Sequence, residues 1–184
     1  ATGEVIAKFK TATDDQVATA LATADAAYRS WRDEPLENRL EVVRTVGRLL
    51  RERADDLAAL AQLEMGKKRN AGNEEAEFSG SIFEFYADQG AKLLADEPIP
   101  TFSGGTAVVQ RRPVGALLGV MPWNYPFYQI ARFAAPNLVV GNTILLKHAE
   151  SVPQCALAMA EIMRDAGVPD GVYTNLFATF DQVQ

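Results

Sequence analysis

Apolar residues in the first half of the chain recur at helical spacing. Between Val17 and Trp31 they lie three or four residues apart, which places them on one face of an amphipathic helix. After Pro35 a second helix is expected over about 36–65, with Gly66 as its stop, and a third over roughly 73–94. The pattern turns these side chains of the second and third helices inward: Leu40, Val43, Val46, Leu50, Leu57, Leu60, Leu63, Phe78, Ile82, Phe85, Tyr86 and Leu93.

The pattern changes after residue 94. Prolines end the helix, Ser103-Gly104-Gly105 predicts a turn, and residues 106–112 read as a β-branched strand. From residue 114, apolar strands at 116–121, 143–147 and 173–178 alternate with helices at 126–140 and after Ser151, which is expected to cap the second of these helices. Apolar strands separated by such helices indicate a parallel sheet with covered faces.

The predicted fold class is therefore α/β, in three segments. Residues 1–97 form a helical part, 98–113 a strand segment, and 114–184 a βαβαβ unit. Such a unit is half of a doubly wound dinucleotide-binding sheet, and the sheet is incomplete as written.

Composition and charge narrow the function classes. The net charge is −6, from 18 basic and 24 acidic side chains, so the basic face that nucleic acid or anionic lipid requires is not expected. The longest apolar run, 130–146, is interrupted by polar residues and does not read as a membrane span. With Cys155 as the one cysteine, no internal disulfide is expected, and we interpret the protein as cytoplasmic.

Candidate chemistry follows the first strand of the βαβαβ unit. Residues 121–126, Met-Pro-Trp-Asn-Tyr-Pro, place a tryptophan and a primary amide at the carboxyl end of a parallel strand, where open α/β sheets bind ligands. The Asn124 amide is suited to donate to an oxygen that becomes negative during attack on a carbonyl. From chemistry alone, capping of the following helix is an equal alternative for Asn124.

The motifs resemble those of the aldehyde dehydrogenase superfamily. The resemblance lies in residues 112–127, in the strand segment 145–150 and in 166–172, and more weakly in 64–67 and 1–4. It implies a parallel cofactor domain without the Gly-x-Gly-x-x-Gly loop, a separate catalytic domain, and an oligomerisation hairpin of which 100–113 is one part. A homodimer or homotetramer is then expected.

The same resemblance assigns roles to residues of the unit. Asn124 becomes the side-chain donor of an oxyanion hole. Met121, Pro122 and Trp123 line the nicotinamide end of the cofactor site. Lys147 and Glu150 hold the hydroxyls of the adenosine ribose, since an ammonium donates and a carboxylate accepts. A carboxylate at Glu150 repels a 2′-phosphate, so NAD is expected over NADP; its alternative role is to cap the next helix.

Arg132 indicates the substrate. It lies eight residues after Asn124 on the same expected helix, among apolar residues, with Tyr128 one turn before it. A surface salt bridge is the ordinary account of this arginine. Residues 146–149 and 152–156 resemble the bacterial succinate-semialdehyde dehydrogenases more than other members. In those enzymes the corresponding arginine binds the distal carboxylate of the substrate. Arg132 and Tyr128 are therefore candidate substrate-binding residues, and the expected substrate is an aldehyde with a distal carboxylate.

The implied reaction needs groups that these residues do not supply. A cysteine thiolate attacks the aldehyde, hydride passes to the nicotinamide, and a glutamate activates water. Cys155 falls in a predicted helix and is interpreted as a structural, buried residue, while the single His148 cannot build a metal site. The chain alone is expected to be inactive. A non-catalytic nucleotide-binding or subunit-interaction paralogue, or a dehydrogenase for another aldehyde, remains an alternative.

Overall fold

The computed structural model describes residues 4–102 and 104–183, so the resemblance at residues 1–3 and the turn residue Ser103 lie outside the described residues. Two regions make up the chain, a helical amino-terminal region and a region of alternating strands and helices. The elements are α1 (Asp14–Trp31), α2 (Leu36–Glu52), α3 (Ala54–Met65), α4 (Arg69–Leu93), β1 (Glu97–Ile99), β2 (Ala107–Val109), β3 (Ala116–Met121), α5 (Tyr128–Val140), β4 (Thr143–His148), α6 (Pro153–Asp165), β5 (Tyr173–Asn175) and the short 3₁₀ turn η1 (Asp181–Val183).

The three strands of the βαβαβ unit form the predicted parallel sheet. Its order is β3-β4-β5, with Ala116 opposite Thr143 and Ile144 opposite Tyr173. β4 is the central strand and is buried along its whole length, as its continuous apolar sequence predicts. The α/β fold class is confirmed.

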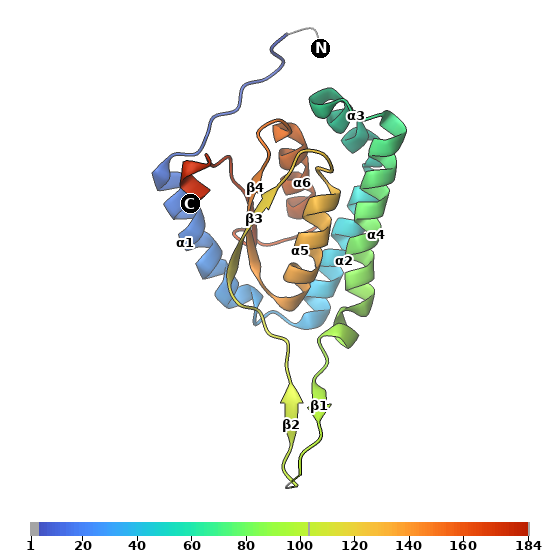
Figure 1. The fold of residues 1–184 in the computed structure, drawn as a ribbon, viewed down its shortest axis with the longest axis vertical. Coiled ribbons are helices and arrows are strands. Elements are labelled where there is room, and N and C mark those ends of the chain that lie inside the picture. The colour runs from blue at the N-terminus through green and yellow to red at the C-terminus, as the bar shows by residue number, and fades with distance from the viewer. Residues whose placement is uncertain (1–3, 103, 184) are drawn as a thin grey trace.

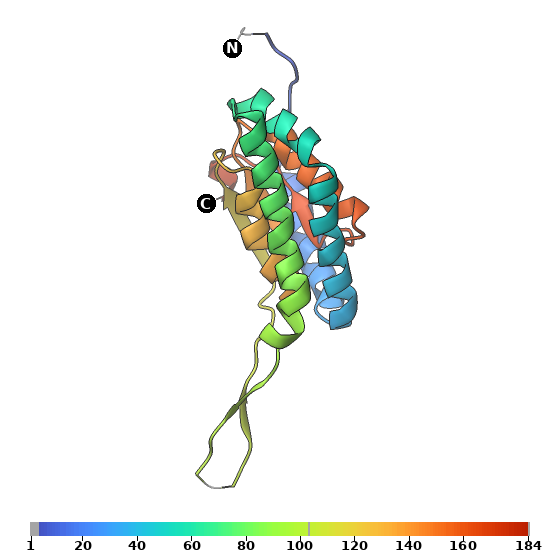
Figure 2. The same ribbon diagram turned by 90° about the vertical axis from the view of Figure 1, so that its right-hand side faces the viewer.

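Helices cover the sheet in layers. α1 packs on one face of the sheet, whereas α5 and α6 lie on the other, and α2 and α4 form a further layer outside α5 (Figure 1). A view at right angles shows α2 and α4 lying side by side along their length (Figure 2). The body thus buries its apolar core between α5, α6 and the surrounding helices.

A two-stranded hairpin projects from this body (Figures 1 and 2). β1 pairs with β2 in antiparallel register, with Pro98 opposite Val108. The sequence predicted a strand pair near 100–113, but the first strand lies earlier, at 97–99, where the central proline lacks an N–H for a ladder and hides the strand from the pattern. Both hairpin strands lie within residues 97–109.

Two expectations for the helical region were wrong. The helix expected over 36–65 is divided at Arg53 (φ −104°, ψ 13°), although the apolar periodicity runs through this point. The inner face expected for the third helix is correct only in part: Ile82 and Tyr86 pack against the core, whereas Phe78, Phe85 and Leu93 are exposed, and so is Leu63 of α3.

The buried face of α4 consists mainly of small residues together with Phe83, and close helix packing is the reason. A Cβ added at Gly80 would stand 2.7 Å from the backbone oxygen of Gly47 on α2. The two backbones therefore approach more closely than any larger residue permits, and Phe78 and Phe85 are left on the outer side of α4.

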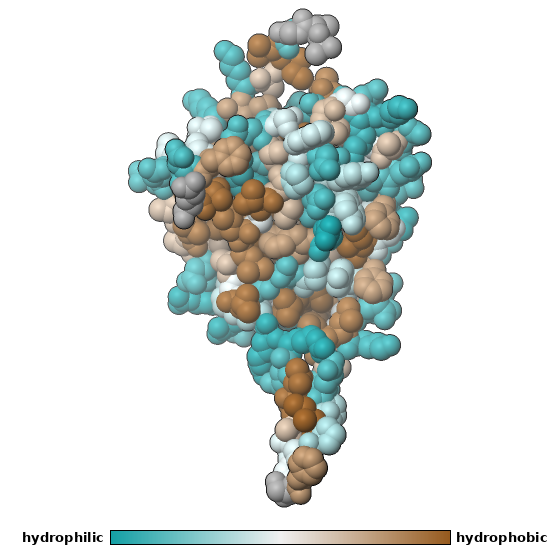
Figure 3. All heavy atoms as spheres, in the orientation of Figure 1, coloured by the Kyte–Doolittle hydropathy of each residue, from teal (hydrophilic) through white to brown (hydrophobic). Residues whose placement is uncertain are grey.

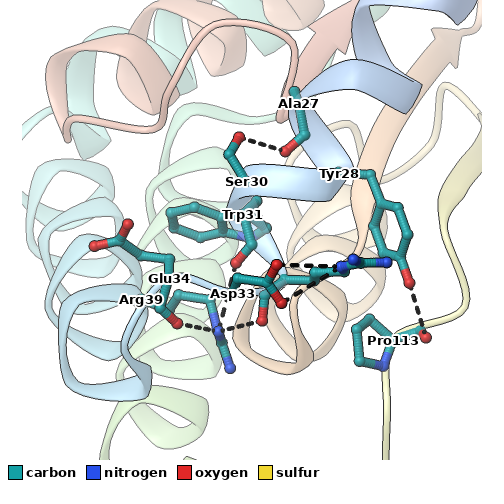
Figure 4. Close-up of polar contacts among 9 residues, drawn as sticks. Ala27, Tyr28, Ser30, Trp31, Asp33, Glu34, Arg39 and Pro113 are labelled. Atoms are coloured by element: carbon teal, nitrogen blue, oxygen red, sulfur yellow. Dashed lines mark hydrogen bonds and ion pairs between the residues drawn. The ribbon is translucent and has the colours of Figure 1, made fainter.

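A buried arginine fastens the α1–α2 connection to α5. The Arg39 guanidinium donates to the backbone oxygens of Trp31, Arg32, Glu34 and, at 3.0 Å, Val139. Figure 4 shows Arg39 below the end of α1, pointing toward the Trp31 and Glu34 carbonyls. The Trp31 indole adds a second tie, since its Nε1 donates to the Leu138 oxygen at 3.1 Å. One side chain thus donates to four carbonyl groups at the ends of α1 and α5 and in the connection between α1 and α2, where helix ends leave carbonyl groups without helical partners.

We predict that Arg39→Met lowers the free energy of unfolding by about 3 kcal/mol, because it removes charged hydrogen bonds and leaves buried carbonyls unsatisfied. Urea denaturation of the variant and the parent protein measures this difference. Arg48→Met is the matched control on α2, since among the described residues Arg48 forms only an exposed pair with Glu52, and it should change stability by less than about 0.5 kcal/mol. Equal effects of the two substitutions would contradict the role given to Arg39.

Candidate functional site

The carboxyl ends of β3 and β4 bring the two groups of candidate residues to one edge of the sheet. Met121 stands opposite His148, and Val120 opposite Lys147. The segment that carries Trp123 and Asn124 therefore leaves the sheet beside the strand end that carries Lys147. The pattern of strands predicted this neighbourhood correctly.

Asn124 does not cap the following helix. α5 begins at Tyr128, its N-cap is Phe127, and no N-cap side chain bonds to its first turn. Instead, Oε1 of Glu75 on α4 accepts from the backbone N–H groups of Phe127 at 2.9 Å and Tyr128 at 3.1 Å. Asn124 itself is exposed, and its side chain has no hydrogen-bond partner among the residues that the structure describes. The amide is free to serve a ligand.

Tyr128 and Arg132 line a groove between α5 and α4. The groove has a volume of about 420 Å³ and is otherwise lined by Phe78, Ser81, Ile82, Phe85 and Tyr86. Phe78 stacks on Tyr128 with ring centroids 5.6 Å apart, and the Arg132 guanidinium lies 5.6 Å from the centroid of the same tyrosine ring. The exposed aromatic residues of α4 thus belong to the groove wall.

Arg132 has no salt bridge within the described residues. Its contact with the Tyr128 ring is a cation–π contact, which leaves the N–H groups of the guanidinium available. The ordinary account of Arg132 as half of a surface ion pair is therefore not what the structure describes. The planar Arg132 guanidinium, with its available N–H donors, lines the aromatic groove. Such a group is suited to bind a carboxylate.

Lys147 and Glu150 meet at the end of β4. Lys147 is buried, Glu150 is exposed, and Lys147 Nζ lies 3.8 Å from Glu150 Oε1. The ammonium also lies 4.2 Å from the centroid of the Phe180 ring. No lining residue is shared between the groove at Arg132 and the 240 Å³ hollow at Glu150. The residues at Arg132 and at Glu150 therefore belong to two separate hollows.

Glu150 does not cap α6, and neither does Ser151, which was expected to. The N-cap of α6 is Val152, and no N-cap side chain bonds there. The cap comes from α3, where the two carboxylate oxygens of Glu64 accept from the N–H groups of Gln154 at 2.8 Å and Cys155 at 2.9 Å. Glu150 is thereby free of the structural role that was its alternative.

Three polar residues near the site were not singled out from the sequence. They are Glu64, Glu75 and Lys67, whose ammonium pairs with the other oxygen of Glu75. A signal for Glu75 was present, because it falls on the same helical stripe as the small buried residues of α4. A carboxylate on a buried stripe requires partners. The sequence does not show which distant backbone groups provide them.

Cys155 and His148 are buried among these groups. Burial raises the pKa of the Cys155 thiol, and the nearby carboxylate of Glu64 adds to this effect. A thiol held protonated is a poor nucleophile. Burial also lowers the pKa of His148, so its imidazole is neutral near pH 7. Neither residue is arranged as a nucleophile with an activating base.

In the described residues, no helix combines the length and the apolar character that crossing a membrane would need.

Comparisons with known proteins agree with the motifs. The model of the aldehyde dehydrogenase family matches residues 1–183. The chain is 45% identical over 183 residues to a succinate-semialdehyde dehydrogenase [NADP(+)] of Deinococcus radiodurans, covering 100% of this chain and 38% of that protein. It is 39% identical to the succinate semialdehyde dehydrogenase [NAD(P)+] Sad of Escherichia coli, covering 100% of this chain and 39% of that protein.

A solved structure is equally similar. The succinic semialdehyde dehydrogenase of Streptococcus pyogenes, in complex with NADP+, superposes with a TM-score of 0.95 at 38% identity, over 99% of this chain and 40% of that one. The chain thus spans about 40% of the length of the relatives that it matches. Family model, relatives and fold concur, and the chain belongs to the aldehyde dehydrogenase family.

Proposed function

We propose that this sequence is part of a protein that oxidises succinate semialdehyde to succinate with NAD(P)+. The proposed substrate rests on one observation, the environment of Arg132. Its guanidinium is exposed, has no ion pair in the described residues, and lies in the wall of an aromatic groove on the helix that follows Asn124. The groove accepts the carbon chain of a short aldehyde, and the guanidinium binds its distal carboxylate. The names of the relatives support the same substrate.

In the proposed reaction Asn124 is the catalytic residue that this sequence contributes. When a thiolate adds to the aldehyde carbon, the carbonyl oxygen becomes negative, and the Asn124 Nδ2–H donates to it. Because the Asn124 side chain has no hydrogen-bond partner within the described residues, no protein bond must be broken first. Cys155 is not the thiolate in this proposal, since it is buried and its pKa is raised. The nucleophile and the general base belong to other parts of the full-length protein.

The residues at the end of β4 fit a dinucleotide. Lys147 has a buried ammonium with three donors, and its described carboxylate partner, Glu150, is 3.8 Å away, beyond hydrogen-bond length. Spare donors in a buried site suit the ribose hydroxyls, and Glu150 is placed to accept from the same diol. Met121, Pro122 and Trp123 extend from β3 toward the proposed nicotinamide end. The nicotinamide, when bound, accepts the hydride of the aldehyde.

Replacing Arg132 tests the substrate. In the full-length protein, Arg132→Met should lower kcat/KM for succinate semialdehyde by roughly 10- to 100-fold, because a charged bidentate contact is lost. Butanal, which lacks the carboxylate, should lose less than about threefold, so steady-state kinetics with both aldehydes separates binding of the charge from general damage. A variant that keeps its kcat/KM for succinate semialdehyde would refute the role of Arg132.

Glu150 tests the choice of cofactor. Its carboxylate repels a 2′-phosphate, which predicts a preference for NAD, whereas the relatives are named for NADP+ or NAD(P)+. Glu150→Gln should raise kcat/KM for NADP about tenfold and leave the value for NAD nearly unchanged, which corresponds to removing ~1.4 kcal/mol of repulsion. A strong NADP preference in the unsubstituted full-length protein would contradict the predicted preference for NAD.

We further propose that the hairpin joins copies of the protein into a homodimer or homotetramer. Its side chains Ile99, Phe102, Val108 and Val109 are exposed, and Figure 3 shows apolar surface along the projecting hairpin. Exposed apolar residues on a short antiparallel ribbon suit pairing with a second copy.

Val108→Glu in the full-length protein should therefore shift the molecular mass measured by light scattering toward a smaller assembly, since it places a charge in the proposed contact. Val114→Glu is the control, because Val114 is exposed outside the hairpin strands. An unchanged mass for both variants would argue against the hairpin as the contact.

A further inference from the structure

Four consecutive residues after Asn124 are each held by a polar or charged side chain. Lys67 Nζ lies 4.0 Å from the centroid of the Tyr125 ring. The carbonyl oxygen of Pro126 is 2.9 Å from His148 Nε2. The backbone N–H groups of residues 127 and 128 both donate to Glu75. We call Lys67, Glu75 and His148 the clamp.

The two sides of the clamp come from different parts of the fold. Glu75 lies on the buried face of α4 and is 5% exposed, and its two carboxylate oxygens are divided between the start of α5 and the Lys67 ammonium. A carboxylate at a helix N-terminus is stabilised by the N–H groups and by the helix dipole. With Lys67 as counterion, the buried charge is compensated.

His148 holds the same segment from the sheet. The N–H of Ala149 donates to His148 Nδ1 at 2.8 Å, so Nδ1 carries no hydrogen. The hydrogen of the neutral ring is then on Nε2, which donates to the Pro126 oxygen. Position 148 is the last residue of β4 and stands opposite Met121, so the ring fixes the loop to the strand from which it departs.

The clamp holds the residues that directly follow Asn124. Its side chain is exposed and forms no hydrogen bond in the part of the chain that is described, so the direction of its amide depends on its backbone. The β3 strand fixes that backbone on one side, and the clamp fixes it from the residue after Asn124 onward. A catalytic donor without side-chain support needs a rigid backbone to act at full strength.

We propose that Glu75, with Lys67 and His148, is a positioning residue for the oxyanion donor Asn124, an inference that rests on the proposed function. Glu75 does not touch the substrate in this scheme. It acts by accepting from two backbone N–H groups, so its acceptor atoms, and not its charge, carry the effect.

Two double variants of the full-length enzyme separate acceptor from charge. Lys67→Met/Glu75→Gln removes both charges but keeps an amide oxygen as acceptor. Lys67→Met/Glu75→Leu removes both charges and the acceptor at similar side-chain volume. We expect kcat/KM for succinate semialdehyde to be about 100-fold lower with Leu than with Gln. The dissociation constant for the cofactor, measured by fluorescence titration, should be the same in both.

The same pair is then compared in an Asn124→Ala background. If Glu75 acts through Asn124, the 100-fold difference between Gln and Leu at position 75 falls to less than about threefold, because the group being positioned is gone. A residue that only stabilises the fold would show the full difference in both backgrounds.

Glu64 supplies the matched control, since it caps α6 as Glu75 caps α5 but does not contact residues 125–128. Any difference between Glu64→Gln and Glu64→Leu should persist unchanged in the Asn124→Ala background. If the variant that carries Glu75→Leu does not fold, His148→Leu is used in its place. This substitution removes the donor to the Pro126 oxygen, on the opposite side of the segment. Its effect on kcat/KM should likewise disappear in the Asn124→Ala background.

The outcomes distinguish the two proposals. An unsubstituted full-length protein that oxidises no aldehyde overturns the proposed function, and the positioning role with it. An active enzyme in which Gln and Leu at position 75 differ equally with and without Asn124 overturns the positioning role alone. A difference that requires Asn124 supports it.

Discussion

Two carboxylates from the helical region, each at the N-terminus of a helix in the sheet region, hold the two regions of this chain together. Glu75 reaches from α4 to α5, and Glu64 from α3 to α6. Helix N-termini leave backbone N–H groups without partners, and a buried start requires an acceptor from elsewhere. Because both acceptors come from outside the βαβαβ unit, the start of each crossover helix depends on the packing of the helical layer.

That packing depends in turn on small residues. The contact of Gly47 with Gly80 lets α2 and α4 approach closely, and the buried stripe of α4 that contains Gly80 also carries Glu75 toward the start of α5. The same arrangement leaves Phe78 and Phe85 on the other side of the helix, where they form the wall of the groove beside Arg132. The close packing of α2 and α4 therefore determines both the position of Glu75 at the start of α5 and the shape of the groove beside Arg132.

The sequence predicted the two strands at the centre of the unit well and the others less well. The limits of β3 agree with the expected 116–121, and β4 differs by one residue, because apolar runs bounded by turn residues mark buried strands directly. The strands expected over 173–178 and 106–112 are shorter, since β5 ends at Asn175 and β2 covers only 107–109. The break at Arg53 and the inner face of α4 were not found. Periodicity identifies large apolar residues, whereas glycine, alanine and serine make up most of that inner face. The helix caps at Glu64 and Glu75 were missed for a different reason, since their partners lie 52 or more positions away and local patterns do not connect them.

Neither Asn124 nor Glu150 caps the helix that follows it, and this supports their assignment to a ligand site. Asn124 and Glu150 each stand just before a helix, where a polar residue ordinarily serves as a cap. In both places a distant glutamate has taken that role, so neither side chain serves as a helix cap at its position. Polar groups at the carboxyl end of a parallel sheet that the fold does not use are available to a ligand. In the proposed function, Asn124 on the segment that leaves β3 serves the reacting carbonyl, and Glu150 beyond the end of β4 serves the ribose.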